Sequence, residues 1–134
     1  MDESMDAKDK YGYTGLMLAC KNGHIGVVRL LLKRSTDVNT MDYQDRTPLF
    51  LACENGHDTC VRVLLDMRAN VNLVNNYGST ALMLACKNGH IGVVRLLLKR
   101  GAAMDVKDKY GNTALKLARN DECGLALKTH QQQA

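Results

Sequence analysis

The sequence predicts an all-α solenoid, a row of similar helical pairs stacked side by side. A segment of 19 residues, LMLACKNGHIGVVRLLLKR, occurs twice without a single change, at 16–34 and at 82–100. A diverged copy at 49–68 lies halfway between them, so the repeat length is 33 residues. Self-similarity at this period is typical of stacked supersecondary units, which act through an extended surface more often than through one pocket.

Each unit is expected to open with a turn and to continue into a short helix. In the third unit the turn segment NNYGST is followed by ALMLACKN, which has the apolar spacing of a helix. Thr is favoured at the start of a helix and Pro at its first position, so Thr47-Pro48 marks the same start in the second unit. Glycine readily takes the positive φ that ends a helix. The first helices are therefore expected to end at Gly23, Gly56 and Gly89.

A second helix is predicted from about His90 to Lys99 in the third unit, closed by Gly101. It is too apolar all round for a surface helix and suits one packed between neighbours. Gly26 and Gly92 lie inside such helices, where Gly costs about 1 kcal/mol relative to Ala. We therefore expect a folded array of modest stability.

The repeat length divides the chain into a lead-in and four units. The predicted boundaries are a polar lead-in at 1–8, repeats at 9–41, 42–74 and 75–107, and a partial C-terminal capping repeat with its tail at 108–134. A chain of this length can form one compact array.

In-phase motifs give these units a family resemblance. They are the D-x-x-G-x-T openings, TPL at 47–49, NGH in three units and the VVRLLL runs. With these motifs the chain resembles the ankyrin repeat over about residues 9–128. The resemblance implies antiparallel helical pairs joined by long, β-hairpin-like loops that project like fingers. The family usually has His after T-P-L, where it supports a hydrogen-bond network. This chain instead has Met17, Phe50, Met83 and Lys116 there.

The two ends of the array are expected to differ. By the 33-residue spacing, Lys128, Thr129, His130 and Gln131 replace the RLLL of the inner copies, as expected for a terminal repeat with a polar outer face. The first unit has the same helices as the third and lacks this treatment. Its outer face is expected to be exposed, to be covered by a partner, or to mediate self-association.

Composition limits the cellular compartment and the kinds of partner that are expected. Five Cys is an odd number, and three of them recur with the period, so a disulfide framework is not expected and a reducing cytoplasmic or nuclear setting fits. The start has no apolar signal segment, and no stretch is long and apolar enough to span a membrane. The net charge of +4 is mild. A basic strip along the second helices is interrupted at Asp66 and Met67, so nucleic acid is not the expected partner.

Cys and His recur at a C-x3-H spacing: Cys20 and His24, Cys53 and His57, Cys86 and His90. Zinc is one reading, but each unit offers at most two ligands where a closed site needs four. A Cys nucleophile with a His base is another reading, although a catalytic pair needs only one copy. We favour a structural role for these pairs and expect no metal, no cofactor and no catalytic residue.

Tyrosine is the most informative polar feature, because all five tyrosines fall in the hairpin openings. Tyr offers a large contact area with few torsions to restrict, which suits a binding surface. The alternative is that each Tyr packs one finger on the next. In ankyrin-type proteins the fingertips and the inner face of the first helices bind the partner. The surface implied here comprises Tyr11, Tyr13, Met17, Lys21, Tyr43, Arg46, Phe50, Glu54, Tyr77, Met83, Lys87 and Tyr110.

The resemblance also implies a modification. Ankyrin-type repeats can be hydroxylated at a hairpin Asn that has Leu eight residues before it. Leu31 with Asn39 fits this pattern, and Leu64 with Asn72 fits it less well. The simpler interpretation is that both Asn side chains hydrogen-bond the turn.

These features predict a non-enzymatic module that binds another protein as a scaffold, adaptor or inhibitor. A structural spacer within a larger ankyrin array is the first alternative, and an enzyme built on the Cys/His pairs is the second. The near-identical copies fit either recent duplication or deliberate design.

Overall fold

The structure is a computed structural model that describes residues 7–34 and 36–133. Most of the predicted lead-in at 1–8, together with Ser35 and Ala134, therefore lies outside the described residues.

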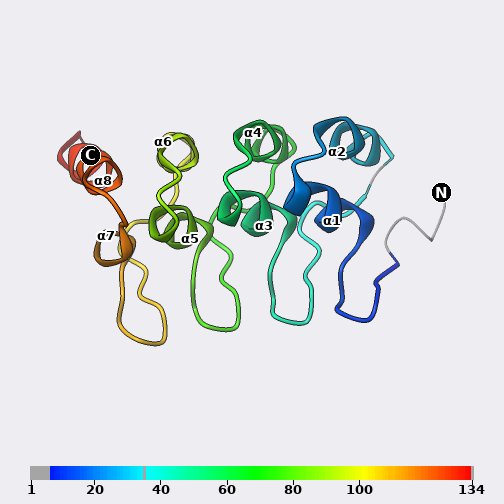
Figure 1. Ribbon diagram of the computed structural model, residues 1–134, viewed down its shortest axis with the longest axis horizontal. Helices are drawn as coiled ribbons and strands as arrows, with labels where there is room; N and C mark the ends of the chain where they lie inside the picture. Colours follow the sequence, from blue (N-terminus) through cyan, green and yellow to red (C-terminus); the bar gives the residue numbers. More distant parts are fainter. Residues whose placement is uncertain (1–6, 35, 134) are drawn as a thin grey trace.

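The described residues form eight α-helices arranged as four antiparallel pairs. Figure 1 shows the pairs side by side, with the first helices in one row, the second helices in another, and long loops projecting beyond the first row. The only β contact within the described ranges is a single bridge between Val74 and Thr80. The fold is thus the expected all-α solenoid. Its helices are α1 (Gly15–Asn22), α2 (Ile25–Leu32), α3 (Pro48–Glu54), α4 (Asp58–Asp66), α5 (Ala81–Lys87), α6 (Ile91–Lys99), α7 (Ala114–Leu117) and α8 (Asp121–Gln133).

Threonine starts each first helix, as the sequence predicted. Its side-chain oxygen accepts a hydrogen bond from the backbone N–H three residues later, which satisfies one of the donors left free at a helix start. Pro48 occupies the first position of α3, where it has no N–H to leave unpaired. The four capping residues are Thr14, Thr47, Thr80 and Thr113.

Glycine follows the first helices for two reasons. Gly23, Gly56 and Gly89 have φ of 73°, 74° and 73°, the left-handed conformation that was predicted. There is also no room for a side chain at two of these positions. A Cβ on Gly23 would lie 2.6 Å from Nδ1 of His57, and a Cβ on Gly56 would lie 2.6 Å from Nδ1 of His90. These glycines thus let the histidine of the next repeat approach.

Side-chain hydrogen bonds link successive repeats. Nε2 of His57 lies 3.0 Å from the carbonyl oxygen of Lys21, and Nε2 of His90 lies 3.0 Å from that of Glu54. Since a carbonyl oxygen only accepts, each of these nitrogens donates. The His after N-G therefore links repeats in a chain that lacks the His after T-P-L.

A second set of links runs through the loops. Oδ1 of Asn39 accepts the backbone N–H of Asn70 at 2.9 Å, and Oδ1 of Asn72 accepts that of Ala103 at 2.9 Å. The bonds that these two Asn side chains accept therefore come from the next repeat and not from their own turn.

The register of the last repeat differs from the expected one. Helix α8 begins at Asp121, three residues earlier than the 33-residue spacing from Ile91 requires. Helix α7 stops at Leu117, after which the N–H of Arg119 donates to the carbonyl of Cys86 and Oδ1 of Asn120 accepts the N–H of Cys123. The predicted correspondence of Lys128–Gln131 with RLLL is therefore wrong. Counted from the helix starts, the matching residues are Leu125, Ala126, Leu127 and Lys128.

Candidate functional site

The projecting loops are held by the residue that opens each of them. One side-chain oxygen of this Asp or Asn accepts two backbone N–H groups, from the residues two and four positions later. Such local bonds replace the pairing that a strand would supply, so the loops are ordered without a sheet. The four residues are Asp9, Asp42, Asn75 and Asp108.

The loops also contact one another through the backbone. The N–H of Asn76 donates to the carbonyl of Gln44 at 3.1 Å, and that of Lys109 donates to the carbonyl of Tyr77 at 2.9 Å. A longer bond of 3.4 Å joins the N–H of Tyr43 to the carbonyl of Tyr11. The fingertips are therefore connected from the first loop to the fourth.

A groove of about 460 Å³ runs along the inner side of the first helices, across repeats 2 to 4. Its walls come from the loops and its floor from the helices α3, α5 and α7. Half of the predicted surface lines this one groove: Arg46, Phe50, Glu54, Tyr77, Lys87 and Tyr110.

Lysine 109 is a part of this region that the sequence analysis missed. Its ammonium lies 4.3 Å from the ring centroid of Tyr77 and 5.2 Å from that of Tyr110, close enough for a cation–π interaction with both rings. Its position directly before Tyr110 is the signal that could have identified it. The two aromatic rings and one cation form an exposed group beside the groove.

Arg46 is held in place by its neighbours. Its Nε donates to Oδ2 of Asp42 at 2.9 Å, its Nη1 lies 3.9 Å from Glu54, and its Nη2 donates to the hydroxyl of Tyr13. Burial alone would lower the pKa of Arg46, but the hydrogen bond and charge of Asp42 outweigh it and raise that pKa. Arg46 thus fixes the wall of the groove and remains charged.

The tyrosines of the first loop lie outside the groove and form a second aromatic group. The rings of Tyr11 and Tyr13 are 6.1 Å apart, and the ammonium of Lys21 lies 5.4 Å from the Tyr13 ring. Tyr13 joins this group to the groove through its bond with Arg46. Tyr43 is exposed but does not line the groove, and its ring lies against Gly12 of the preceding loop.

Three residues that were predicted to contact a partner are buried, so the prediction is wrong for them. Met17, Phe50 and Met83 occupy the third position of their helices and are almost fully covered. This position points between adjacent first helices, so a partner gains little or no contact with these side chains. Phe50 contributes only to the floor of the groove.

The cysteines of the recurring Cys/His pairs are buried, whereas His57 and His90 bond carbonyl oxygens of the preceding repeat. All five thiols are unpaired and buried, and burial raises the pKa of each, to about 12 for Cys86. Thiolates are therefore scarce at neutral pH, although the thiolate is the nucleophilic form. Among the described residues, no three His, Cys, Asp or Glu side chains converge as they would around a metal ion.

Asp108 lies in the groove wall with a shifted pKa. Backbone N–H bonds from Asn112 and Tyr110 hold the pKa of this carboxyl below its ordinary value of 3.8, and the charge of Lys87 acts in the same direction. The groove therefore presents fixed positive and negative charge side by side.

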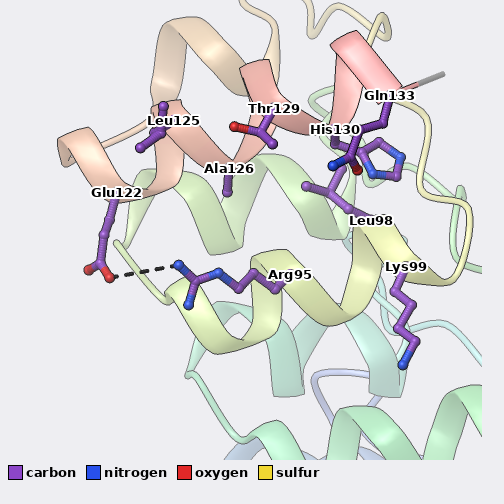
Figure 2. A pocket seen from close by; sticks show the side chains of 9 residues that line it. All are labelled: Arg95, Leu98, Lys99, Glu122, Leu125, Ala126, Thr129, His130 and Gln133. Carbon is purple, nitrogen blue, oxygen red and sulfur yellow. Dashed lines mark ion pairs between the residues drawn. The ribbon is translucent and has the colours of Figure 1, made fainter.

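A second hollow of about 500 Å³ lies between α6 and α8. In Figure 2, Arg95 points toward Glu122, and Leu98 lies below Thr129 and His130. Ala126 of α8 lines this hollow and occupies the helix position that Leu96 holds in α6, so a smaller side chain in the last helix contributes to the hollow. The ion pair there is long, 4.0 Å, and exposed, so it contributes little.

Comparison with known families agrees with the architecture. Family models described as Ankyrin repeats (3 copies) and Ankyrin repeats (many copies) match residues 1–75 and 66–118. The chain belongs to the ankyrin repeat family. Ankyrin repeats are in general non-catalytic modules for protein–protein interaction. The comparison with curated proteins finds no match. Within the described ranges, none of the helices has both the length and the apolar character that a membrane span requires.

Proposed function

We propose that this ankyrin array is a non-enzymatic scaffold, adaptor or inhibitor that binds a partner protein in the groove of repeats 2 to 4. The observation that carries the proposal is the convergence of Tyr77, Tyr110 and Lys87 from two loops and one helix on a single groove. Aromatic side chains with few torsions, beside fixed charges, are typical of the energetically important residues of interfaces.

The mechanism is rigid display. The Asp, Asn and backbone bonds of the loops order the tips before a partner arrives, so association restricts few additional torsions. The two rings lose contact with water on binding, while Lys87 and Asp108 select a partner of complementary charge.

The test is a double substitution, Tyr77→Ala with Tyr110→Ala, in the full chain. Partners captured by the wild-type protein are identified and their affinities measured by titration. We expect the double variant to bind at least 30-fold more weakly, which corresponds to about 2 kcal/mol. Arg46 is left unchanged because it holds Asp42 and Tyr13.

Tyr43→Ala is the matched control, since Tyr43 is an exposed loop Tyr outside the groove. It should bind as the wild type does, and the helical circular dichroism of all variants should be unchanged. If the double variant and the wild type bind the partner with equal affinity, the partner does not bind in the groove and the proposal is wrong.

The spacer alternative is favoured by one observation, the exposed apolar face of α2 described below. A spacer needs no dedicated surface, so groove variants would then leave every captured partner unchanged. A search of flanking sequence for further copies of the 33-residue unit addresses the same alternative.

The enzyme alternative depends on reactive cysteines. We propose that the chain has no catalytic residue and needs no cofactor, which the buried, high-pKa thiols support. A thiol reagent should react slowly with the native protein and quickly after unfolding. One thiol that reacts fast in the native state would revive the enzyme hypothesis.

Two further proposals concern the cellular compartment and a modification of the chain. Five unpaired cysteines favour a reducing cytoplasmic or nuclear compartment. Hydroxylation of Asn39 and Asn72 is proposed from the family resemblance alone, and peptide mass spectrometry of protein from its native source tests it.

A further inference from the structure

Two helices of identical sequence have different surroundings in this array. Both α2 and α6 contain IGVVRLLL, but α6 lies between α4 and α8, whereas within the described residues α2 has a second-row neighbour on one side only. Val27 is 48% exposed and its copy Val93 is 0% exposed. Leu30 is 51% exposed and its copy Leu96 is 8% exposed.

The exposed side chains lie on one face. Val27, Leu30 and Arg34 are exposed and follow one another at helical spacing, with the half-buried Leu31 beside them, and we call these four residues the N-terminal face of α2. In α6 the copy of Arg34 is Arg100, whose Nη2 lies 2.7 Å from Oδ1 of Asp66, the last residue of α4. Figure 2 shows that α8 meets a different face of α6, the one that carries Arg95 and Leu98. The N-terminal face is therefore the one with which α6 binds α4.

Repeat 3 contacts repeat 2 at further positions, and the copies of these positions in repeat 1 are open. A Cβ on Gly92 would meet the carboxylate of Asp58, whereas a Cβ on its copy Gly26 meets no atom within 4 Å. In the same way Arg100 pairs with Asp66, while no carboxylate in the described part of the chain pairs with Arg34. Repeat 1 thus presents the surface that repeat 3 uses to hold a neighbour.

We propose that the N-terminal face of α2 docks an ankyrin-type helical pair whose second helix ends in a carboxylate, as α4 ends in Asp66. The interface consists of an apolar contact surface formed by Val27, Leu30 and Leu31 and an ion pair made by Arg34. Charge argues against a symmetric pair with a second copy of this chain, because residues 25–34 carry Arg29, Lys33 and Arg34 and no acidic residue, and a symmetric pair would bring these charges together. Helices of like charge repel, whereas a carboxylate pairs with Arg34.

The experiment inserts a probe repeat, a copy of residues 42–74, between Lys8 and Asp9 of the full chain. Val27→Cys reports whether the face is covered, since the five native thiols are buried and give a low background. We expect the insertion to slow maleimide labelling of this cysteine at least tenfold. Labelling of a cysteine in place of the exposed Leu125, at the other end of the array, should not change.

The proposed ion pair with Arg34 is tested in the inserted repeat, where the copy of Asp66 is replaced by Lys. Labelling at position 27 should then become faster and the unfolding midpoint should fall. The proposal is overturned if the Lys version protects position 27 equally well, if labelling is unchanged by insertion, or if the inserted repeat stays unfolded, since the same sequence folds between repeats 1 and 3. Protection of position 27 that rises with concentration in the unmodified chain would show that a second copy covers the face, and would also overturn it.

Discussion

Arg68 has a backbone conformation that glycine adopts at the equivalent position of the next repeat. Its φ is 68°, and that of Gly101 is 89°. A side chain with a Cβ is strained in this region by about 1–2 kcal/mol, part of which is offset by the greater freedom of Gly in the unfolded chain. Arg68 and Gly101 each lie two residues after the end of their helix, α4 and α6, so their backbone conformation affects the free energy of the turn that follows.

The first prediction exchanges these two residues. Arg68→Gly should raise the free energy of unfolding by about 0.5–1 kcal/mol, and Gly101→Arg should lower it by a similar amount. Urea denaturation followed by circular dichroism measures both. A neutral or destabilising Arg68→Gly would mean that the long side chain compensates for its backbone.

The second prediction concerns acid. The folded pKa of Asp108 lies below its unfolded value, so the fold favours the charged form. Its contribution to stability is therefore fully present above about pH 4 and is lost as pH falls through the folded pKa. Asp108→Asn should keep the loop bonds, because Asn75 makes the same two bonds in the preceding repeat.

Stability measured between pH 5 and pH 2 should consequently fall less steeply for Asp108→Asn than for the wild type. A carboxyl titration by NMR gives the pKa of Asp108 directly. A folded pKa at or above 3.8 would contradict the interpretation.

At the scale of the helix, the identical copies allow one substitution to be made twice. Gly26 of α2 and Gly92 of α6 hold the same helical position, but only Gly92 is approached by the carboxylate of Asp58. Ala is a better helix residue than Gly by up to about 1 kcal/mol. Gly26→Ala should therefore stabilise the protein by up to that amount.

Gly92→Ala should stabilise the protein less than Gly26→Ala, since the Asp58 side chain must first move. Thermal unfolding of the two variants under one set of conditions provides the comparison. A larger gain at Gly92 than at Gly26 would contradict the packing seen around Asp58.

Helix ends were predictable because their signals are local. Thr47 and Gly56 act on backbone groups within a few residues, so the letters alone define where α3 starts and where its chain turns away. The early start of α8 departs from the period: Asn120 is a local capping signal that the 33-residue spacing hides, and the bond from Arg119 to Cys86 lies in another repeat. Sequence spacing cannot show a contact across repeats.

The same distinction applies to the candidate site. Clustering of Tyr77 and Tyr110 in loops was enough to predict that they lie together on an exposed surface. The direction of Met83 was not, because the third residue of a helix faces inward or outward depending on the neighbouring helix. Lys109 stands next to Tyr110 in the sequence, but its contact with Tyr77 on the preceding loop was beyond sequence reasoning.

For the whole molecule, position in the array determines what a side chain contributes. Leu30→Ala removes a half-exposed side chain and should cost less than about 1 kcal/mol, whereas Leu96→Ala should cost about 2–4 kcal/mol. Chemical denaturation of both variants tests this, because the surrounding helical sequence is the same. Equal losses would show that the face of α2 is covered in solution.

The backbone bonds from fingertip to fingertip also affect the thermodynamics of recognition. Tyr77 and Tyr110 stand on loops that are tied to each other at the main chain, so their rings cannot adjust independently. A partner must therefore match the spacing that the array provides, and induced fit is expected on the partner's side. Titration calorimetry should then give a heat-capacity change that follows from the apolar area removed from water, with no added contribution from ordering of the loops.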